Sequence, residues 1–383
     1  MRIAIVRGAN LNKWEMQNYE PLAERHEVVA YTNDEHKFDL EEIKIPIRRL
    51  SSHKDAGYLE CMTDLEKELK GFDIAYTLDT LYGYSYQTIL AKQRYGVKVV
   101  VCCTENIPFN YEDNPMNRGL SSYAKRESIR SKVKEEADLF IALTERAKVA
   151  LIFEGVPEHK IKVIPWGIDT DLFRPLGEKF RDLMELFGIK ENDRVVLYNG
   201  RYDWHRGVYD LIYAAKSLLD DHELKNISFK FLFIGSGAEI EGMKWLVARL
   251  GIKENVIIFE NYPHKFRYED LPKIYNLATI FCFPSIPTRF IKEQLGMVLL
   301  EAMACGVPVI STFCGSIPEV VKNAGILVQP NDSLSLYQGI KRLSLDRDLR
   351  ERFSLMGRER VEKSFDSKRN ASLIEDIFNE VVG

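Results

Sequence analysis

Short apolar segments rich in valine and isoleucine alternate along the chain with longer segments of helical periodicity. This alternation is typical of βαβ units and predicts parallel sheets. Two series of six strands are expected, and each series has the length and rhythm of one doubly wound domain. The first series comprises residues 2–7, 26–32, 72–78, 98–104, 138–144 and 161–165, and the second comprises 194–199, 228–235, 255–260, 279–284, 307–312 and 325–329.

A segment punctuated by glycine and proline, from Trp166 to Pro175, separates the two series and suits a domain linker. At 383 residues the chain also exceeds the usual length of a single hydrophobic core. After the linker, an apolar stripe from Val208 to Leu219 predicts a helix with one buried face. We therefore expect an α/β chain with two doubly wound domains, residues 1–170 and 171–365, followed by a final helix.

Composition and charge narrow the class of protein. Hydrophobic residues make up 45% of the chain and charged residues 29%, which is typical of a folded protein in water. The net charge of −4 disfavours nucleic acid as a partner. No apolar run approaches the roughly 20 residues of a spanning helix, and the N-terminus has the pattern of a strand rather than a signal peptide. The six cysteines form no CxxC pair, so we expect small core residues in a cytoplasmic, reducing compartment.

Ligands of doubly wound sheets bind beyond the carboxyl ends of the strands, so the loops that leave the strands are the candidate sites. One such loop, Asn199–Gly207, carries Arg201 and Arg206 just before a predicted helix. Two guanidinium groups beside helix N–H donors suit a pyrophosphate, because each offers forked and permanently charged donors. The alternative is that both are solvated surface arginines.

A second loop, which follows the strand ending at Pro284, carries Glu293 and leads into a helix that contains Glu301. A carboxylate that accepts two hydroxyl hydrogen bonds can recognise a ribose diol or a sugar ring. The alternative is a surface glutamate and a helix-stabilising glutamate, although the nearby glycines favour a backbone that approaches a ligand closely. The N–H groups expected to hold a phosphate are those around Leu295, Gly296, Met297 and Val298.

Together these ordered motifs resemble those of the family 4 retaining glycosyltransferases, which have the GT-B fold of two Rossmann-like domains that face an interdomain cleft. The resemblance covers nearly the whole chain and begins with the spacing of Glu293 and Glu301, which are separated by seven residues. The other matching motifs are Glu301–Val309, Gly315–Val320, Gly200-Arg201, Arg206-Gly207, Gly235–Gly237 and Val163–Asp169.

The resemblance implies a role for each matched residue in the second domain. Glu301 would bind the ribose of the donor. Glu293 and the backbone of Gln294–Gly296 would hold the hydroxyls of the transferred sugar. Arg201 and Arg206 would neutralise the diphosphate, so Arg201, Arg206 and Glu293 are the expected catalytic residues.

Three further donor-binding positions are implied on the same grounds. Gly8, in the loop after the first strand, would approach the diphosphate from the first domain. Gly200 belongs to the arginine-bearing loop, and Tyr262 lies where the family seats the base. The first domain would face the acceptor, and the final helix, 366–383, would pack back on it.

The implied activity is transfer of a hexose-type sugar from a UDP-, GDP- or ADP-sugar to a glycan, lipid-linked or small-molecule acceptor, with retention of configuration. The donor is a co-substrate, and no metal or other cofactor is expected. Because no enzyme nucleophile is evident, the resemblance implies attack from the face of the leaving group, whose phosphate accepts the acceptor's proton. Two other classes stay open: a GT-B-like sugar-nucleotide epimerase and a non-catalytic bilobal nucleotide-sugar-binding protein.

The sequence departs from the family pattern at three places. Arg206 stands where the family usually has lysine, which keeps the charge but makes its hydrogen bonding forked. Trp166 replaces the usual asparagine of the linker. Thr104-Glu105-Asn106 stands where a histidine often contacts the donor sugar.

Three weaker signals have competing explanations. Asp169-Thr-Asp171 spells a metal-binding DxD motif but lies in the expected linker. Gly235-Ser-Gly237 matches part of a dinucleotide-binding motif, and a tight turn is the alternative. The basic segment Arg118–Lys134 either gives a weak peripheral contact with anionic lipid on the cytoplasmic membrane face or is a solvated helix face.

Overall fold

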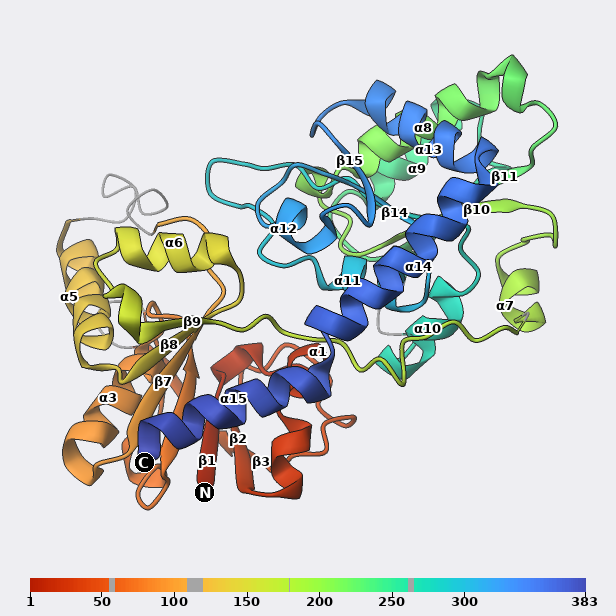
Figure 1. The fold of residues 1–383 in the computed structure, drawn as a ribbon. Coiled ribbons are helices and arrows are strands. Elements are labelled where there is room, and N and C mark those ends of the chain that lie inside the picture. Colours follow the sequence, from red (N-terminus) through yellow and green to blue (C-terminus); the bar gives the residue numbers. More distant parts are fainter. Residues whose placement is uncertain (55–58, 109–119, 179, 261–264) are drawn as a thin grey trace. The chain divides into compact units, whose positions relative to one another are not determined.

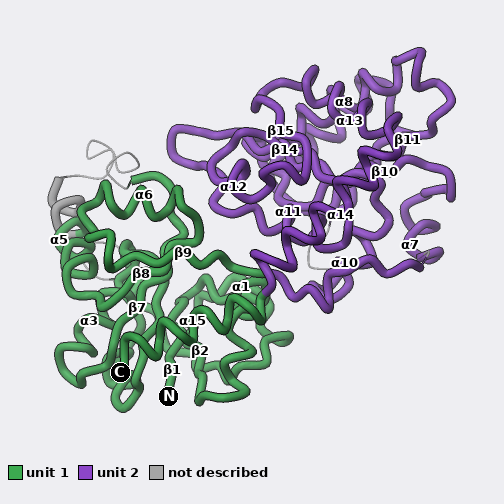
Figure 2. Tube along the Cα trace, in the orientation of Figure 1, with its two compact units in different colours: residues 1–167, 367–383 green, residues 168–366 purple. Residues whose placement is uncertain are grey.

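The computed structural model describes residues 1–54, 59–108, 120–178, 180–260 and 265–383 (Figure 1). The chain forms two compact units (Figure 2). Unit 1 contains Met1–Gly167 together with Ser367–Gly383, and unit 2 contains Ile168–Asp366. Each unit is built on one parallel sheet, which confirms the expected α/β class with two doubly wound domains.

Unit 1 contains a seven-stranded sheet in the order β3-β2-β1-β6-β7-β8-β9, and all of its paired strands are parallel. The strand order reverses between β1 and β6, which is the point where doubly wound sheets bind ligands. Every strand of the predicted first series is present. The sheet consists of these six, which are β1 (Arg2–Val6), β2 (Glu27–Asn33), β6 (Ile74–Leu78), β7 (Lys98–Cys103), β8 (Leu139–Ala142) and β9 (Ile161–Val163), together with the edge strand β3 (Ile47–Leu50).

Three strands of unit 1 are absent from the prediction. The edge strand β3 carries Arg48 and Arg49 and exposes both, so it lacks an apolar signal. The strands β4 (Ser52–Lys54) and β5 (Glu60–Met62) form a separate antiparallel pair of three residues each. Strands this short, with few buried side chains, give too little periodicity to be recognised.

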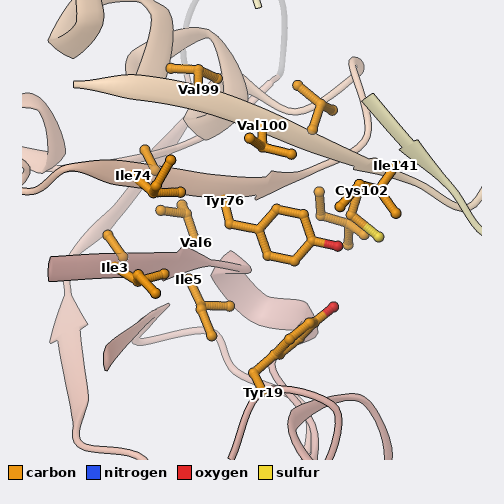
Figure 3. Close-up of a cluster of buried hydrophobic side chains, with 14 of the residues drawn as sticks. Ile3, Ile5, Val6, Tyr19, Ile74, Tyr76, Val99, Val100, Cys102 and Ile141 are labelled. Atoms are coloured by element: carbon orange, nitrogen blue, oxygen red, sulfur yellow. The ribbon is translucent and has the colours of Figure 1, made fainter. Parts of the chain in front are cut away.

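The core of unit 1 lies on both faces of its sheet (Figure 3). Tyr76 of β6 is fully buried, and its ring lies 5.4 Å from that of Phe378 in α15 (Ser367–Val382). The C-terminal helix α15 therefore contributes to the core of unit 1, although the chain reaches it from unit 2. The other α-helices among the described residues of unit 1 are α1 (Lys13–Met16), α2 (Leu65–Glu68), α3 (Gly83–Tyr95), α5 (Leu120–Glu136) and α6 (Glu145–Phe153).

A buried charged group ties the start of the linker to unit 1. Arg7 is fully buried, forms an ion pair with Glu15, and donates to the hydroxyl of Tyr19 at 3.1 Å. The indole N–H of Trp166 donates to the same hydroxyl at 3.1 Å. A buried charge is stable only when its partners satisfy it, so this network fixes the segment around Trp166. The departure at Trp166 thus has a structural explanation.

Unit 2 contains a six-stranded parallel sheet in the order β12-β11-β10-β13-β14-β15, which reverses between β10 and β13. Every strand of the predicted second series is present. The strands are β10 (Arg194–Asn199), β11 (Phe229–Gly235), β12 (Val256–Glu260), β13 (Ile280–Phe283), β14 (Val309–Thr312) and β15 (Gly325–Val328).

The helices of unit 2 cover its sheet. The stripe predicted after the first strand forms α8 (Val208–Asp220), in which Leu211, Ile212 and Leu218 are buried. The others are α7 (Arg181–Leu186), α9 (Ile240–Arg249), α10 (Leu271–Tyr275), α11 (Met297–Ala304), α12 (Ile317–Val321), α13 (Ser333–Leu345) and α14 (Arg347–Ser364).

Two side chains of the basic segment, those of Arg130 and Lys134, form ion pairs within unit 1. Arg130 of α5 is buried and forms ion pairs with Glu154 at 2.5 Å and Glu127 at 3.1 Å. Lys134 donates to the carbonyl oxygen of Glu154 at 3.2 Å. Arg118 and the side chain of Lys125 lie outside the described residues.

Two other expectations concern the whole chain. All six cysteines are buried, which confirms their prediction as small core residues. Among the described residues, the helices are too short or too polar to cross a bilayer.

Candidate functional site

Two loops meet at the carboxyl ends of β10 and β13, where the strand order of unit 2 reverses. A Cβ atom built on Gly207 would lie only 2.0 Å from the carbonyl oxygen of Pro284, so the two backbones are in direct contact. The amide of Ile286 also donates to the carbonyl of His205 at 2.8 Å. Loops that are far apart in sequence are therefore held together at the expected ligand-binding edge.

Arg206 and Glu293 form an ion pair across these two loops. The side chains are only 19% and 12% exposed, so the pair is largely shielded from solvent. The hydroxyl of Ser285 donates to the same carboxylate at 3.4 Å, and the Arg206 guanidinium lies 5.7 Å from the centre of the Phe283 ring. A shielded charge pair is screened less by salt than a surface pair. Because both side chains are largely shielded, the interpretation of Arg206 and Glu293 as solvated surface residues is wrong.

A third loop, which follows β14, supports the backbone of Glu293. The amide of Ser316 donates to the carbonyl of Glu293 at 2.9 Å. A Cβ atom on Gly315 would lie 2.1 Å from that carbonyl oxygen, so only glycine fits there. Three strand-end loops thus converge on Glu293.

Arg201 lies differently from Arg206. Its side chain is 65% exposed, and its closest described carboxylate is that of Asp203, 3.3 Å away on the same loop. The structure therefore brings one of the two candidate arginines to Glu293 and leaves the other at the surface. Gly200, just before Arg201, packs against Gly235, where an added Cβ would lie 1.8 Å from the Gly200 carbonyl oxygen. The glycines at 235 and 237 thus serve close loop packing, as the tight-turn alternative requires.

The helix α11 begins directly after the loop that carries Glu293. Its N-cap is Gly296 at a φ of 75°, and no side chain caps the helix. The first N–H groups of a helix, here at Met297 and Val298, have no intrahelical acceptor. Leu295 and Gln294 precede the cap. This end of α11 can thus offer N–H donors and a partial positive charge to an anion.

Glu301 is 3% exposed in α11 and is held by two tyrosines. Its carboxylate accepts from the hydroxyl of Tyr275 at 2.5 Å and from that of Tyr268 at 3.2 Å. Burial raises the pKa of Glu301 from 4.5 to about 7, although both hydrogen bonds lower it. A glutamate that only stabilised its helix would stay in solvent, so that alternative does not describe Glu301.

Two candidate positions have a different status. Gly8 follows β1, at the reversal point of unit 1, and a Cβ atom there would lie 2.3 Å from a carboxylate oxygen of Glu60. The amide of Ala9 donates to that oxygen at 2.7 Å. Close packing against Glu60 therefore accounts for the glycine at position 8 without a ligand. Tyr262 lies outside the described residues.

The segment that replaces the family's histidine is fixed by Asp79, at the end of β6. The amide and hydroxyl of Thr104 donate to the Asp79 carboxylate at 2.8 and 2.9 Å. Burial raises the pKa of Asp79 from 3.8 to about 6. Asp79 also has a φ of 48°, a conformation that non-glycine residues adopt rarely. Its position just after a predicted strand was the one signal in the sequence that could have drawn attention to it.

The DxD motif has a local structural role. The Asp169 carboxylate accepts from the amides of Asp171 at 3.0 Å and Leu172 at 3.2 Å, which is the pattern of a turn. The hydroxyl of Thr170 donates to Asp366 at 2.6 Å. Within the part of the chain that the structure describes, no group of three or more His, Cys, Asp or Glu side chains has the arrangement of a metal site.

Sequence reasoning missed three residues that the structure places beside the candidates. Tyr268 and Tyr275 bind Glu301. His205 is buried next to Arg206, and its Nε2 atom has no hydrogen-bond partner among the described residues. None of the three has a local sequence signal, because an aromatic residue in a helix or loop usually belongs to the core.

Two family models match the chain. The model of glycosyl transferases group 1 matches residues 180–360, and that of glycosyltransferase family 4 matches residues 20–172. The first match contains the loops of Arg206 and Glu293 and the helix of Glu301. The second covers most of the sheet of unit 1.

Curated relatives match over part or most of their length. The D-inositol 3-phosphate glycosyltransferase of Corynebacterium jeikeium is 32% identical over 234 residues, which are 59% of this chain and 53% of the relative. The alpha-maltose-1-phosphate synthase of Mycolicibacterium smegmatis is 27% identical over 352 residues, which are 85% of each chain. The chain spans about half the length of several curated relatives that it matches.

The solved structure of HepE from Anabaena in complex with UDP is similar to the chain with a TM-score of 0.80. The likeness covers 99% of this chain and 100% of HepE, at 18% sequence identity. It shows that the chain has the GT-B fold.

Replacing Gly315 with alanine tests whether the loop after β14 holds Glu293. Gly188→Ala is a matched control, because the φ angles are 58° and 59° and no other atom lies within 4 Å of a Cβ on Gly188. We expect Gly188→Ala to lower the free energy of unfolding by about 1 kcal/mol through strain alone. Gly315→Ala should cost about 3 kcal/mol or more, because the Glu293 carbonyl must also move. Denaturant titration measures both, and equal losses would contradict this support of Glu293.

Proposed function

The chain belongs to the glycosyl transferases group 1 family, and on this premise we propose that it transfers a hexose from a nucleoside-diphosphate sugar to an acceptor with retention of configuration. The observation that carries the proposal is the shielded Arg206–Glu293 pair at the reversal point of unit 2. A permanent cation beside a carboxylate that could accept sugar hydroxyls suits a sugar diphosphate, which supports the proposal. The loop that carries Glu293 leads directly into α11, whose first turn offers N–H donors and which contains the buried Glu301.

The donor we propose is a UDP-sugar, with GDP- and ADP-sugars as the alternatives to test. UDP is bound in the similar HepE structure, which supports this order of testing. Glu301 would accept hydrogen bonds from the ribose hydroxyls, and the N–H groups of Gly296, Met297 and Val298 would hold the phosphates. The acceptor would be a hydroxyl of a glycan, a lipid-linked sugar or a small molecule, and the reaction would take place in the cytoplasm.

In the proposed reaction, the bond between the anomeric carbon and the diphosphate oxygen breaks while the acceptor oxygen attacks from the same face. The proton of the acceptor hydroxyl passes to the leaving phosphate, so no enzyme base is consumed. Arg206 stabilises the charge that develops on the leaving group. A guanidinium has five N–H donors and a carboxylate has several acceptor positions, so Arg206 and Glu293 can bind donor groups while they stay paired.

We further propose that no divalent metal takes part, because Arg206 and the start of α11 supply the positive charge. The chain should release nucleoside diphosphate from a UDP-, GDP- or ADP-sugar, by transfer or by hydrolysis. The rate of this release should be the same with and without excess EDTA. Loss of activity in EDTA, restored by manganese or magnesium, would contradict metal independence. Formation of an epimerised donor without acceptor would favour an epimerase. Donor binding without any turnover would favour a binding protein.

The two arginines should differ in their effect on turnover. Arg206→Ala should lower turnover by about 10²–10³-fold, because a preorganised positive charge is removed from the leaving group. Arg201→Ala should lower it by less than about tenfold, since exposed charges are screened by solvent and salt. Arg206→Lys is the control that keeps the charge. Steady-state kinetics of all three variants make the comparison, and equal effects at Arg201 and Arg206 would contradict it.

The two glutamates should separate by ligand. Glu301→Ala should weaken binding of the bare nucleoside diphosphate by about ten- to hundredfold, the usual effect of losing a charged hydrogen-bond partner. Glu293→Ala should leave that affinity nearly intact while turnover collapses, because its contacts form with the transferred sugar. Calorimetric titration with the product nucleotide, beside turnover assays, measures both effects. The opposite pattern would mean that the two roles are exchanged.

A further inference from the structure

A chain of hydrogen bonds joins Glu301 to the loop that carries Arg206. The side-chain amide of Asn199 donates to the hydroxyl of Tyr275 at 2.9 Å, and that hydroxyl donates to Glu301 Oε2 at 2.5 Å. Asn199 is the last residue of β10 and lies directly before Gly200. The proposed phosphate-binding loop and the proposed ribose-binding carboxylate are therefore connected through one tyrosine.

The direction of this chain follows from the chemistry of its members. The NH₂ group of an amide can only donate, so the Tyr275 oxygen accepts from Asn199 and its own proton points to Glu301. Glu301 Oε2 must then be an acceptor. On the other oxygen, Oε1, the hydroxyl of Tyr268 donates at 3.2 Å. One acceptor position on each carboxylate oxygen is filled, and the orientation of the carboxylate is fixed.

The two tyrosines are themselves immobilised by packing. Tyr275 of α10 is fully buried, and its ring lies 5.5 Å from that of Phe281 in β13. Phe173 contacts both tyrosines, with ring centres 5.2 Å from Tyr268 and 6.2 Å from Tyr275. Side chains held in this way cannot follow a carboxylate that turns, so they define one position for it.

We propose that Tyr275, supported by Asn199 and Tyr268, is a positioning residue that holds the Glu301 carboxylate in the orientation in which it accepts the two ribose hydroxyls of the donor. This inference rests on the proposed function and adds residues outside the motifs that carry the family resemblance. Tyr275 contacts Glu301 rather than the donor, so it acts through the carboxylate.

The same contacts control when Glu301 is ionised. Burial raises the pKa of Glu301 to about 7, and the hydrogen bonds from Tyr275 and Tyr268 oppose this rise. Among the described residues, the buried Cys305 thiol lies close enough to Glu301 for their charges to interact, and Arg358 of α14, which donates to the carbonyl of Ala304 at 2.8 Å, acts on the same thiol. As the pH falls below about 7, Glu301 of the ligand-free chain takes up a proton. A ribose diol, in contrast, binds best to the ionised carboxylate, which accepts its hydrogen bonds. Nucleotide affinity should therefore fall below about pH 7.

The test is calorimetric titration of the full chain with UDP, GDP and ADP between about pH 6 and about pH 9. Tyr275→Phe should lose about tenfold in affinity at the alkaline end, the usual effect of one hydrogen bond to a charged group. It should also move the midpoint of the pH dependence upward, because a hydrogen bond that favours the carboxylate is gone. Tyr268→Phe should shift the midpoint less, because its bond is longer.

Tyr337→Phe is the matched control, because the hydroxyl of Tyr337 donates to Asp221 at 2.6 Å elsewhere in unit 2. Tyr337→Phe should change neither the affinity for the nucleotide nor the midpoint of its pH dependence. If Tyr275→Phe does not fold, Asn199→Ala replaces it, with a smaller shift in the same direction expected. A wild-type chain that binds none of the three nucleotides would overturn the proposed function. Binding with an unchanged midpoint in Tyr275→Phe or Asn199→Ala would overturn the positioning role alone.

Discussion

The contact between the loops after β10 and β13 is the constraint on which the candidate site depends. Parallel strands that are neighbours in a sheet end at the same edge, so the reversal of strand order in unit 2 brings two distant loops together. Gly207 lets the two backbones touch, and the Arg206–Glu293 pair closes the contact. Gly315 then fixes the Glu293 backbone from a third loop. A larger residue at either glycine would push these loops apart and disturb the pairing of Arg206 with Glu293.

Burial determines the electrostatics of both units. In unit 1 the fully buried Arg7 is matched by Glu15, and in unit 2 the shielded Arg206 is matched by Glu293. Among the described residues Glu301 is held by two tyrosine hydroxyls and by no cation, and its burial raises its pKa toward neutrality. A buried carboxylate held only by hydroxyls becomes sensitive to pH near neutrality. The site thus combines the Arg206–Glu293 ion pair with one buried carboxylate whose pKa is raised.

Much of the fold was accessible from the sequence, because buried parallel strands are continuous apolar runs. The predicted ends often extend too far, as at residues 138–144 against the observed β8 (Leu139–Ala142). Leu143 explains the difference, since it is buried although it lies beyond the strand. The edge strand β3 was missed because its exposed arginines conceal it. Of the site, the loops and the two glutamates were recognised, but the difference between Arg201 and Arg206 was not.

The sequence by itself determined the apolar strands of both sheets, the loops that follow them and the glycines that such loops need, because these depend on local periodicity and backbone freedom. Only the tertiary structure decided which charges meet. Arg206 and Glu293 are 87 residues apart, and Tyr275 and Glu301 are 26 apart. Their pairing depends on strand order and on how α10 packs beside α11, which no local pattern encodes. Hydrogen bonds and desolvation act over a few ångströms in space, so the properties of these side chains appear only once the chain has folded.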